Sequence, residues 1–354
     1  MLSTAADKPN ILFVVVDDLG WNDVDHLPDQ PSRYKTPQIR ALAESGMIFD
    51  QAYAACPVCS PTRASLLTGK SPAALKLTAH IPGNPASNAK RIPKNSTMLP
   101  PAYNFQLNMG EQTFAELLKA DGYTTAFIGK WHLSGAGSVT KRAAKGIVDP
   151  KFQPEAQGFD LNIGGCAYGQ PPSYFDPYRN ATIADRKPGE YLTDRLTDEA
   201  ISFMIETRAA PFLAYLNYYN VHTPLKAKKA DIALMAKAGF KGKFATYAAM
   251  TKSVDDNIGR LITALDDAGL RQNTLVIFTS DNGGLQGNAP LRGLKGEMWE
   301  GGVRVPQIVS WPGKIKAGTR CHEPVISYDF LPTLVAISES NSTSAKTPKK
   351  PKIS

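Results

Sequence analysis

The residues best suited to chemistry lie in one short run, PVCSPTRASLLTG at positions 57–69. Pro61 fits the first turn of a helix, where the N–H that proline lacks has no partner, and Gly69 can adopt the left-handed conformation that ends one. Cys59 then lies at the helix N-terminus, where backbone N–H groups and the helix dipole favour negative charge. Because Arg63 follows about one turn later, it can reach the same place. The run predicts a cysteine that handles an anion.

The cysteine spacing leaves other interpretations open. Cys56 and Cys59 form a Cys-x-x-Cys pair, which is also typical of half a zinc site or of a thioredoxin-like redox pair. A zinc site would need a second such pair or a Cys/His pair, whereas Cys166 and Cys321 stand alone. A redox pair remains an alternative. A plain buried cysteine would explain Cys59 but not its proline and arginine neighbours.

Acidic and amide side chains follow two predicted strands. The run NILFVVV at 10–16 is typical of a strand buried on both faces, and it ends in Asp17 and Asp18. A later buried run ends in Asp281 and Asn282. Buried adjacent carboxylates are costly unless something neutralises them, and a hard cation is the simplest neutraliser. For the Asp-Asp pair alone, a solvated turn is the alternative.

Basic side chains follow two other predicted strands. Lys130 and His132 come directly after the strand predicted at 123–128, and His222 comes shortly after the one predicted at 211–216. A lone lysine is usually a surface residue and a lone histidine is usually structural. These three differ because each lies just beyond the carboxyl end of a strand.

The elements that must position these residues alternate between strands and helices. The clearest helix covers 247–265, where apolar residues repeat at three and four positions. Alternation of this kind predicts an α/β fold, a mostly parallel sheet with helices on both faces. Ligands of such sheets bind beyond the carboxyl ends of the strands. The four strand ends should therefore combine oxygen ligands for a metal, cations for an anion and imidazoles for proton transfer.

Two motifs carry a family resemblance. The run from Cys59 to Gly69 resembles the signature of type I sulfatases, Cys-x-Pro-x-Arg followed by a hydrophobic pair, Thr and Gly. GYTTAFIGKWH at 122–132 resembles the second signature of that family, and His222 matches its His-x-Pro stretch. The resemblance implies an alkaline-phosphatase-like fold and an arylsulfatase-like sulfuric ester hydrolase. Its substrate would be a sulfated carbohydrate or an aryl sulfate, from which it releases inorganic sulfate and an alcohol.

The resemblance also implies a nucleophile and a metal. Cys59 would be oxidised to formylglycine by a formylglycine-generating enzyme or a radical maturase, and Arg63 would hold the aldehyde hydrate that attacks sulfur. A divalent cation, calcium in preference to magnesium, would bind a sulfate oxygen. Its implied ligands are Asp17, Asp18, residue 59, Asp281 and Asn282.

The remaining roles implied by the family concern charge and proton transfer. Asp281 would take the proton of the nucleophile, and Lys130 and Lys295 would neutralise the sulfate oxygens. His222 or Lys295 would protonate the departing alcohol. His132 would remove the second hydroxyl proton, so that the covalent sulfate is expelled and the aldehyde returns.

Composition limits the possible partners. The chain has 354 residues, of which 42% are hydrophobic and 20% charged, with a formal net charge of +8. This suits one large α/β domain or two smaller ones. No apolar run approaches the length of a membrane span, and no nucleic-acid-binding motif accompanies the positive charge. The charge suits an anionic substrate, but it suits a solvated surface equally well.

The compartment depends on what precedes the sequence in the natural protein. Residues 1–9 are polar and lack the apolar core of a signal peptide. Four cysteines do not make a disulfide framework in a chain of this size. We expect a periplasmic or secreted protein if an export signal precedes this sequence, and a cytoplasmic one otherwise.

We divide the chain into an N-terminal tail at 1–9, a catalytic domain at 10–337 and a basic tail at 338–354. The basic tail has no pattern of a buried face, which predicts disorder. The segments 70–109 and 134–185 are expected to be long loops, the second lying over the site. Type I sulfatases normally continue into a smaller C-terminal subdomain, which we expect to be missing.

Two other function classes remain open. A phosphatase or phosphonate monoester hydrolase of the same superfamily would use Ser or Thr as the nucleophile, or a two-zinc site rich in histidine. The chain has only five histidines, which argues against the two-zinc site. The other class is a binding protein or an inactive truncated paralogue.

Overall fold

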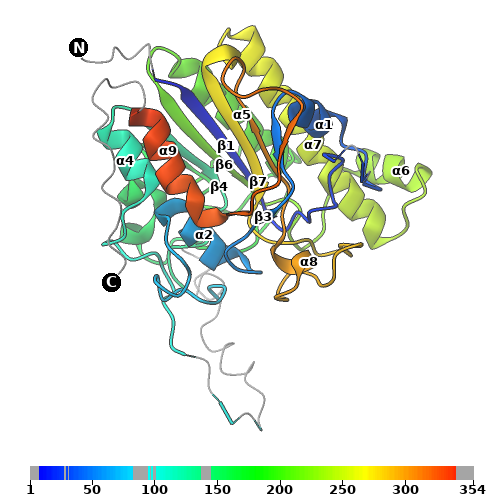
Figure 1. Ribbon diagram of the computed structural model, residues 1–354. Helices are drawn as coiled ribbons and strands as arrows, with labels where there is room; N and C mark the ends of the chain where they lie inside the picture. The colour runs from blue at the N-terminus through cyan, green and yellow to red at the C-terminus, as the bar shows by residue number, and fades with distance from the viewer. Residues whose placement is uncertain are drawn as a thin grey trace.

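The fold is built around a central sheet, which is present in the computed structural model of the chain (Figure 1). The structure describes residues 8–27, 29–30, 32–82, 95, 97–98, 101–136 and 145–339. In this part of the chain, eight strands form the sheet in the order β5-β4-β6-β1-β7-β8-β2-β9. They are β1 (Asn10–Val16), β2 (Met47–Phe49), β4 (Thr124–Gly129), β5 (Leu161–Ile163), β6 (Phe212–Tyr218), β7 (Thr274–Ser280), β8 (Gln307–Ser310) and β9 (Thr319–Cys321).

Most of this sheet is parallel. The strands β5, β4, β6, β1 and β7 are parallel neighbours, whereas β8 runs antiparallel to both β7 and β2. Strand β9 is parallel to β2. A separate two-stranded sheet pairs β3 (Ala52–Tyr53) with β10 (Val325–Ile326). The predicted α/β class with a mostly parallel sheet is confirmed.

The strand register brings four strand ends to one edge. Val16, the last residue of β1, pairs with Tyr218 on β6 and with Ser280 on β7. Gly129, the last residue of β4, pairs with Asn217 on β6. The segments that follow β1, β4, β6 and β7 therefore leave the sheet side by side.

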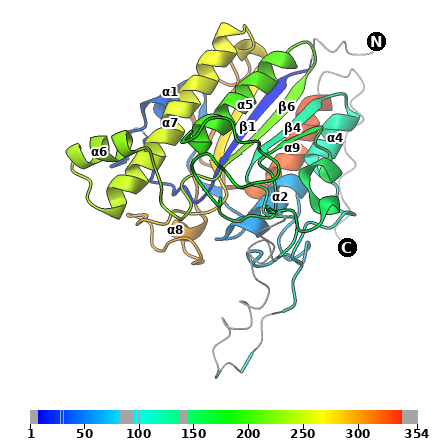
Figure 2. The same cartoon turned by 180° about the vertical axis from the view of Figure 1, so that it is seen from behind.

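Helices cover both faces of the sheet. On one face lie α2 (Cys59–Thr68), α4 (Phe114–Ala120) and α9 (Phe330–Glu339), and on the other lie α1 (Pro37–Glu44), α5 (Leu192–Glu206) and α7 (Lys243–Asp267) (Figures 1 and 2). Helices α6 (Lys229–Lys237) and α8 (Glu300–Val303) lie away from the centre of the sheet. No helix in the described segments is both long enough and apolar enough to cross a membrane.

Strand β1 separates the two hydrophobic cores. Its alternate residues Leu12 and Val14 pack in the core under α1, α5 and α7, whereas Ile11 and Phe13 pack in the core under α2, α4 and α9. Side chains of successive strand residues point to opposite faces, so a strand between two helical layers must be apolar throughout. All seven residues of β1 are buried, as the continuous apolar run predicts.

Helix α2 begins and ends where the sequence indicates. Its first residue is Cys59, and Gly69 closes it with a φ of 65°, the left-handed conformation predicted there. All ten residues of the helix are buried. A helix buried on every side holds its N-terminus firmly against the sheet edge.

The structure departs from the predicted elements at several boundaries. Within 134–185, which was expected to be irregular, β5 adds a three-residue strand that is too short to produce a hydrophobic pattern. Helix α9 continues through Ser338 and Glu339, so the predicted disordered tail cannot begin at 338. Ser338 is buried because the last turn still packs on the domain. The rest of that predicted tail, 340–354, and residues 1–7 lie outside the described residues, as do 83–94 of the first predicted loop.

Candidate active site

Three carboxylates meet at the carboxyl edge of the sheet. Asp17 and Asp18 follow β1 and Asp281 follows β7, and these two strands are neighbours. Each of the three side chains offers an oxygen that lies within 4.8 Å of the other two, and all three are 0% exposed. Three buried carboxylates at one point repel one another and need positive charge nearby.

Each carboxylate has a cationic partner. Lys130 Nζ lies 2.6 Å from Asp17 Oδ2, and Lys295 Nζ lies 2.6 Å from Asp18 Oδ1. The Arg63 guanidinium donates to Asp281 Oδ2 through Nε at 2.9 Å and is 2.8 Å from it through Nη2.

Arg63 is held by more than its carboxylate. Its Nη1 donates to the backbone oxygen of Lys130 at 2.7 Å and to Asn217 Oδ1 at 3.1 Å. The residue is 2% exposed. The guanidinium therefore joins the ends of β4, β6 and β7 in one buried network.

The pKa values of the carboxyls differ with their neighbours. Burial raises the pKa of Asp17 well above its usual range, and Asp281 and Asp18 add to this although Lys130 opposes it. Burial also disfavours the charged form of Asp18, but Lys295 and His222 outweigh it and hold that pKa below its usual range. The Asp281 pKa is likewise lowered because Arg63 and Lys130 outweigh burial. Asp17 is the carboxyl whose charge is least compensated by the protein.

Two oxygens in the group lack a hydrogen-bond donor among the described residues. Asp17 Oδ1 and Asn282 Oδ1 are both buried in this state. Asn282 uses its Nδ2 to donate to Asp18 Oδ1 at 2.8 Å and to the Gly283 oxygen at 3.0 Å, which leaves its amide oxygen available. Unsatisfied buried oxygens beside three carboxylates fit a hard divalent cation, for which carboxylate and amide oxygens are the preferred ligands.

Cys59 faces a histidine with a defined tautomer. Its Sγ is 3.3 Å from His132 Nδ1, and Ser60 Oγ is also 3.3 Å from that nitrogen. His132 Nε2 is 2.8 Å from the Ile81 backbone oxygen, which can only accept a hydrogen bond. Nε2 therefore carries the proton and Nδ1 presents a lone pair to residue 59.

Electrostatics favour a neutral His132 and an anionic group at Cys59. Burial lowers the pKa of His132 well below its usual range, and Lys130 lowers it further. Burial would raise the pKa of the Cys59 thiol, but Lys130 and Lys295 outweigh this effect and the thiol pKa is lowered. A histidine that stays neutral can act as a base toward the group at position 59.

His222 lies beside Asp18. Its Nε2 is 3.7 Å from Asp18 Oδ2, and its Nδ1 is 2.6 Å from the Thr223 backbone oxygen. Burial lowers the pKa of His222 to about 4, although Asp18 opposes this. Lys295 keeps its proton, because Asp18 raises its pKa although burial opposes this.

The backbone is strained at two of these positions. Asp18 and His132 have φ values of 62° and 58°, in the left-handed region that residues other than glycine rarely adopt. Such conformations persist where the surrounding structure imposes them, and they concentrate at functional sites.

All of the residues predicted for the site come together in this group. The structure places Cys59, Arg63, Lys130, His132, His222, Lys295, Asp17, Asp18, Asp281 and Asn282 around the same strand ends. Their individual roles stay predictions. Two residues of the site were not predicted from the sequence: Asn217, which contacts Arg63, and Ser60, which contacts His132. Asn217 lies near the end of β6, so the rule applied to the other strand ends could have found it.

Comparison with known proteins identifies similar chains. The family model described as Sulfatase matches residues 9–339. N-acetylgalactosamine-6-sulfatase of Mus musculus is 32% identical, in a match that covers 94% of this chain and 63% of that protein. Steryl-sulfatase of Mus musculus is 31% identical, in a match that covers 94% of this chain and 62% of that protein. The chain thus spans less than two thirds of the length of these relatives.

A solved structure shares the fold closely. The structure of Ps i-CgsB in complex with k-i-k-neocarrahexaose has a TM-score of 0.78 and 32% sequence identity. The match covers 94% of this chain and 72% of that one.

Proposed function

Because the chain belongs to the sulfatase family, we propose that it hydrolyses sulfate esters to inorganic sulfate and an alcohol. The observation that carries this proposal is the position of Cys59. It lies at the buried N-terminus of α2, 3.3 Å from a neutral histidine nitrogen and beside three carboxylate–cation pairs. This arrangement suits a nucleophile that attacks an anionic centre.

In the proposed reaction, residue 59 is a formylglycine made from Cys59 by a separate maturation enzyme, and its hydrate supplies the nucleophilic oxygen. Arg63 orients Asp281, to which its Nε donates a hydrogen bond and its Nη2 lies 2.8 Å away, and Asp281 accepts the proton of the attacking hydroxyl. Lys130 and Lys295 neutralise the sulfate oxygens. A calcium ion held by Asp17, Asp18, Asp281, Asn282 and residue 59 would add positive charge at the sulfate and lower the pKa of the nucleophile.

Two proton transfers complete the proposed cycle. Lys295 or His222 protonates the departing alcohol. Lys295 is the better donor in the geometry seen here, because burial keeps His222 neutral and its Nδ1 hydrogen is engaged by Thr223. His132 Nδ1 then accepts the second hydroxyl proton of residue 59, so that sulfate leaves and the aldehyde returns. A cysteine adduct has no second hydroxyl and could not complete this step.

For the substrate, we propose a sulfated saccharide. One relative is named for N-acetylgalactosamine 6-sulfate chemistry, and another was solved with an oligosaccharide.

The test combines mass spectrometry with an activity assay. When the protein is produced together with a formylglycine-generating enzyme, the peptide that contains both Cys56 and Cys59 should lose one sulfur and two hydrogens and gain one oxygen. Fragmentation should place this change on residue 59. Cys59→Ala should abolish sulfate release from 4-nitrophenyl sulfate, whereas the matched variant Cys56→Ala should retain it. An active preparation in which Cys59 is wholly unmodified would refute the proposal.

A further inference from the structure

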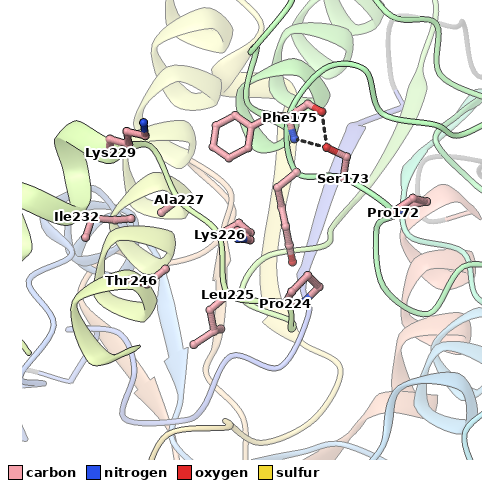
Figure 3. A pocket seen from close by; sticks show the side chains of 11 residues that line it. Pro172, Ser173, Phe175, Pro224, Leu225, Lys226, Ala227, Lys229, Ile232 and Thr246 are labelled. Atoms are coloured by element: carbon pink, nitrogen blue, oxygen red, sulfur yellow. Dashed lines mark hydrogen bonds between the residues drawn. The ribbon is translucent and has the colours of Figure 1, made fainter. Parts of the chain in front are cut away.

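A cavity lies beside the candidate active site. It measures about 730 Å³, within the range of roughly 300–1,000 Å³ that is usual for ligand pockets. Its walls come from the loop at 172–175, from the segment 224–229, and from Ile232 and Thr246 on α6 and α7 (Figure 3). The mechanism proposed above uses none of these residues.

One tyrosine joins this pocket to the active site. Tyr174 lines the pocket, and its hydroxyl donates to the backbone oxygens of His222 at 2.7 Å and Tyr219 at 2.8 Å. Pro224, on the same wall, is only two residues beyond His222. Because His222 Nε2 lies 3.7 Å from Asp18 Oδ2, residues 222–224 connect the carboxylates to the wall of the pocket.

The pocket combines an aromatic face with two available cations. Phe175 is held in place by ring contact with Tyr191, whose centroid lies 5.1 Å away, and by its N–H, which donates to Ser173 Oγ at 3.1 Å. Lys226 and Lys229 are exposed, and neither forms an ion pair with another residue of the described segments. In the view of Figure 3, Lys229 and Phe175 are drawn toward one end of the pocket, and Pro224 and Leu225 toward the other.

The neighbouring lysine, Lys228, differs from these two cations. Lys228 Nζ is 3.1 Å from Asp194 and 3.6 Å from Asp231, so its charge is already compensated. Lys226 and Lys229 thus supply the positive charge that lines the pocket without a described partner. An apolar ring next to unpaired cations complements a ligand that has both an apolar face and a negative charge, such as a sulfated sugar.

We propose that this pocket binds the sugar next to the one whose ester is cleaved, with Phe175 packing on its ring and Lys226 and Lys229 binding a second sulfate. The proposal rests on the function proposed above and deepens it. The preferred substrate is then a saccharide that carries sulfates on neighbouring sugars.

Sucrose octasulfate is a suitable probe, since it presents sulfates in every direction from two joined sugars, and unsulfated sucrose is its neutral control. Binding is measured by titration calorimetry on the Cys59→Ala protein, in which no ester can be cleaved. Lys226→Ala/Lys229→Ala should weaken sucrose octasulfate binding about tenfold, the effect expected from losing two partly exposed ion pairs. Phe175→Ala should weaken it roughly three- to tenfold.

The matched control is Lys237→Ala/Lys241→Ala. It removes the same charge from exposed lysines near the other end of α6 that do not line the pocket. This control should bind the probe within twofold of the parent protein. Equal weakening by both double variants would overturn the proposal, because general surface charge would then explain the binding. If Phe175→Ala abolishes binding while Lys226→Ala/Lys229→Ala leaves it unchanged, the proposal is also overturned, because the pocket would then recognise an apolar group of the alcohol and not a second sulfate.

The proposed function is tested separately by sulfate release from 4-nitrophenyl sulfate by the mature, unsubstituted protein. Failure of that assay would count against the proposed hydrolysis of sulfate esters, whereas the binding comparison reports on the pocket alone.

Discussion

Arg63 should be among the residues on which stability depends most. Replacing it by Ala removes the hydrogen bonds to Asp281, the Lys130 oxygen and Asn217, and leaves the Asp281 carboxylate buried without its main partner. Removing one member of a buried ion pair typically costs about 3–5 kcal/mol. We therefore expect Arg63→Ala to lower the free energy of unfolding by about that amount.

The measurement is urea unfolding followed by circular dichroism. The protein is produced without a maturation enzyme and kept in a chelator, so that neither formylglycine nor a metal contributes. The matched control is Arg260→Ala, because Arg260 also bonds to an aspartate, Asp198, but is 44% exposed. Exposed ion pairs are worth about 1 kcal/mol or less, so this control should unfold at nearly the same urea concentration as the parent.

A double-mutant cycle separates the unpaired charge from simple loss of packing. Asp281→Asn removes the charge that Arg63 compensates, so Arg63→Ala should cost at least about 2 kcal/mol less in that background. If the two substitutions are additive, or if Arg63→Ala costs no more than Arg260→Ala, the reasoning about the buried pair is wrong.

Two other predictions concern the metal and the pH dependence. The protein should bind one equivalent of calcium, or of magnesium less tightly, and Asp281→Ala should lose both calcium and sulfate release; elemental analysis that finds two equivalents of zinc would contradict this. Asp255 accepts hydrogen bonds from the N–H groups of Gln38 and Ile39 at the start of α1, and burial raises its pKa to about 7. Since the unfolded carboxyl has a pKa near 4, its contribution to stability is complete below about pH 4 and is lost as the pH rises through about 7. Asp255→Asn should therefore gain stability relative to the parent between pH 5 and pH 8 in urea unfolding, whereas a difference that stays constant with pH would refute the assignment.

Local patterns were sufficient for the central strands and for the start of α2. The apolar run at 10–16 is typical of a strand covered on both faces, and the Cys59 to Gly69 run contains its own helix start and stop. In a parallel sheet the carboxyl ends lie at one edge whatever the order of the strands. This rule grouped Asp17, Asp281 and the other strand-end residues without any knowledge of the fold.

The tertiary structure alone decided which of these groups pair. The strand order places β1 between β6 and β7. In the folded chain Arg63 donates a hydrogen bond to Asp281, 218 positions away, and Lys295 donates one to Asp18, 277 positions away. No local pattern encodes such pairings, because they depend on how distant segments cross the sheet edge. The pocket beside His222 likewise exists only because a loop before α5 packs against the segment that follows β6. The sequence by itself thus determined the chemical groups at the strand ends, whereas long-range packing determined their partners and the cavity next to them.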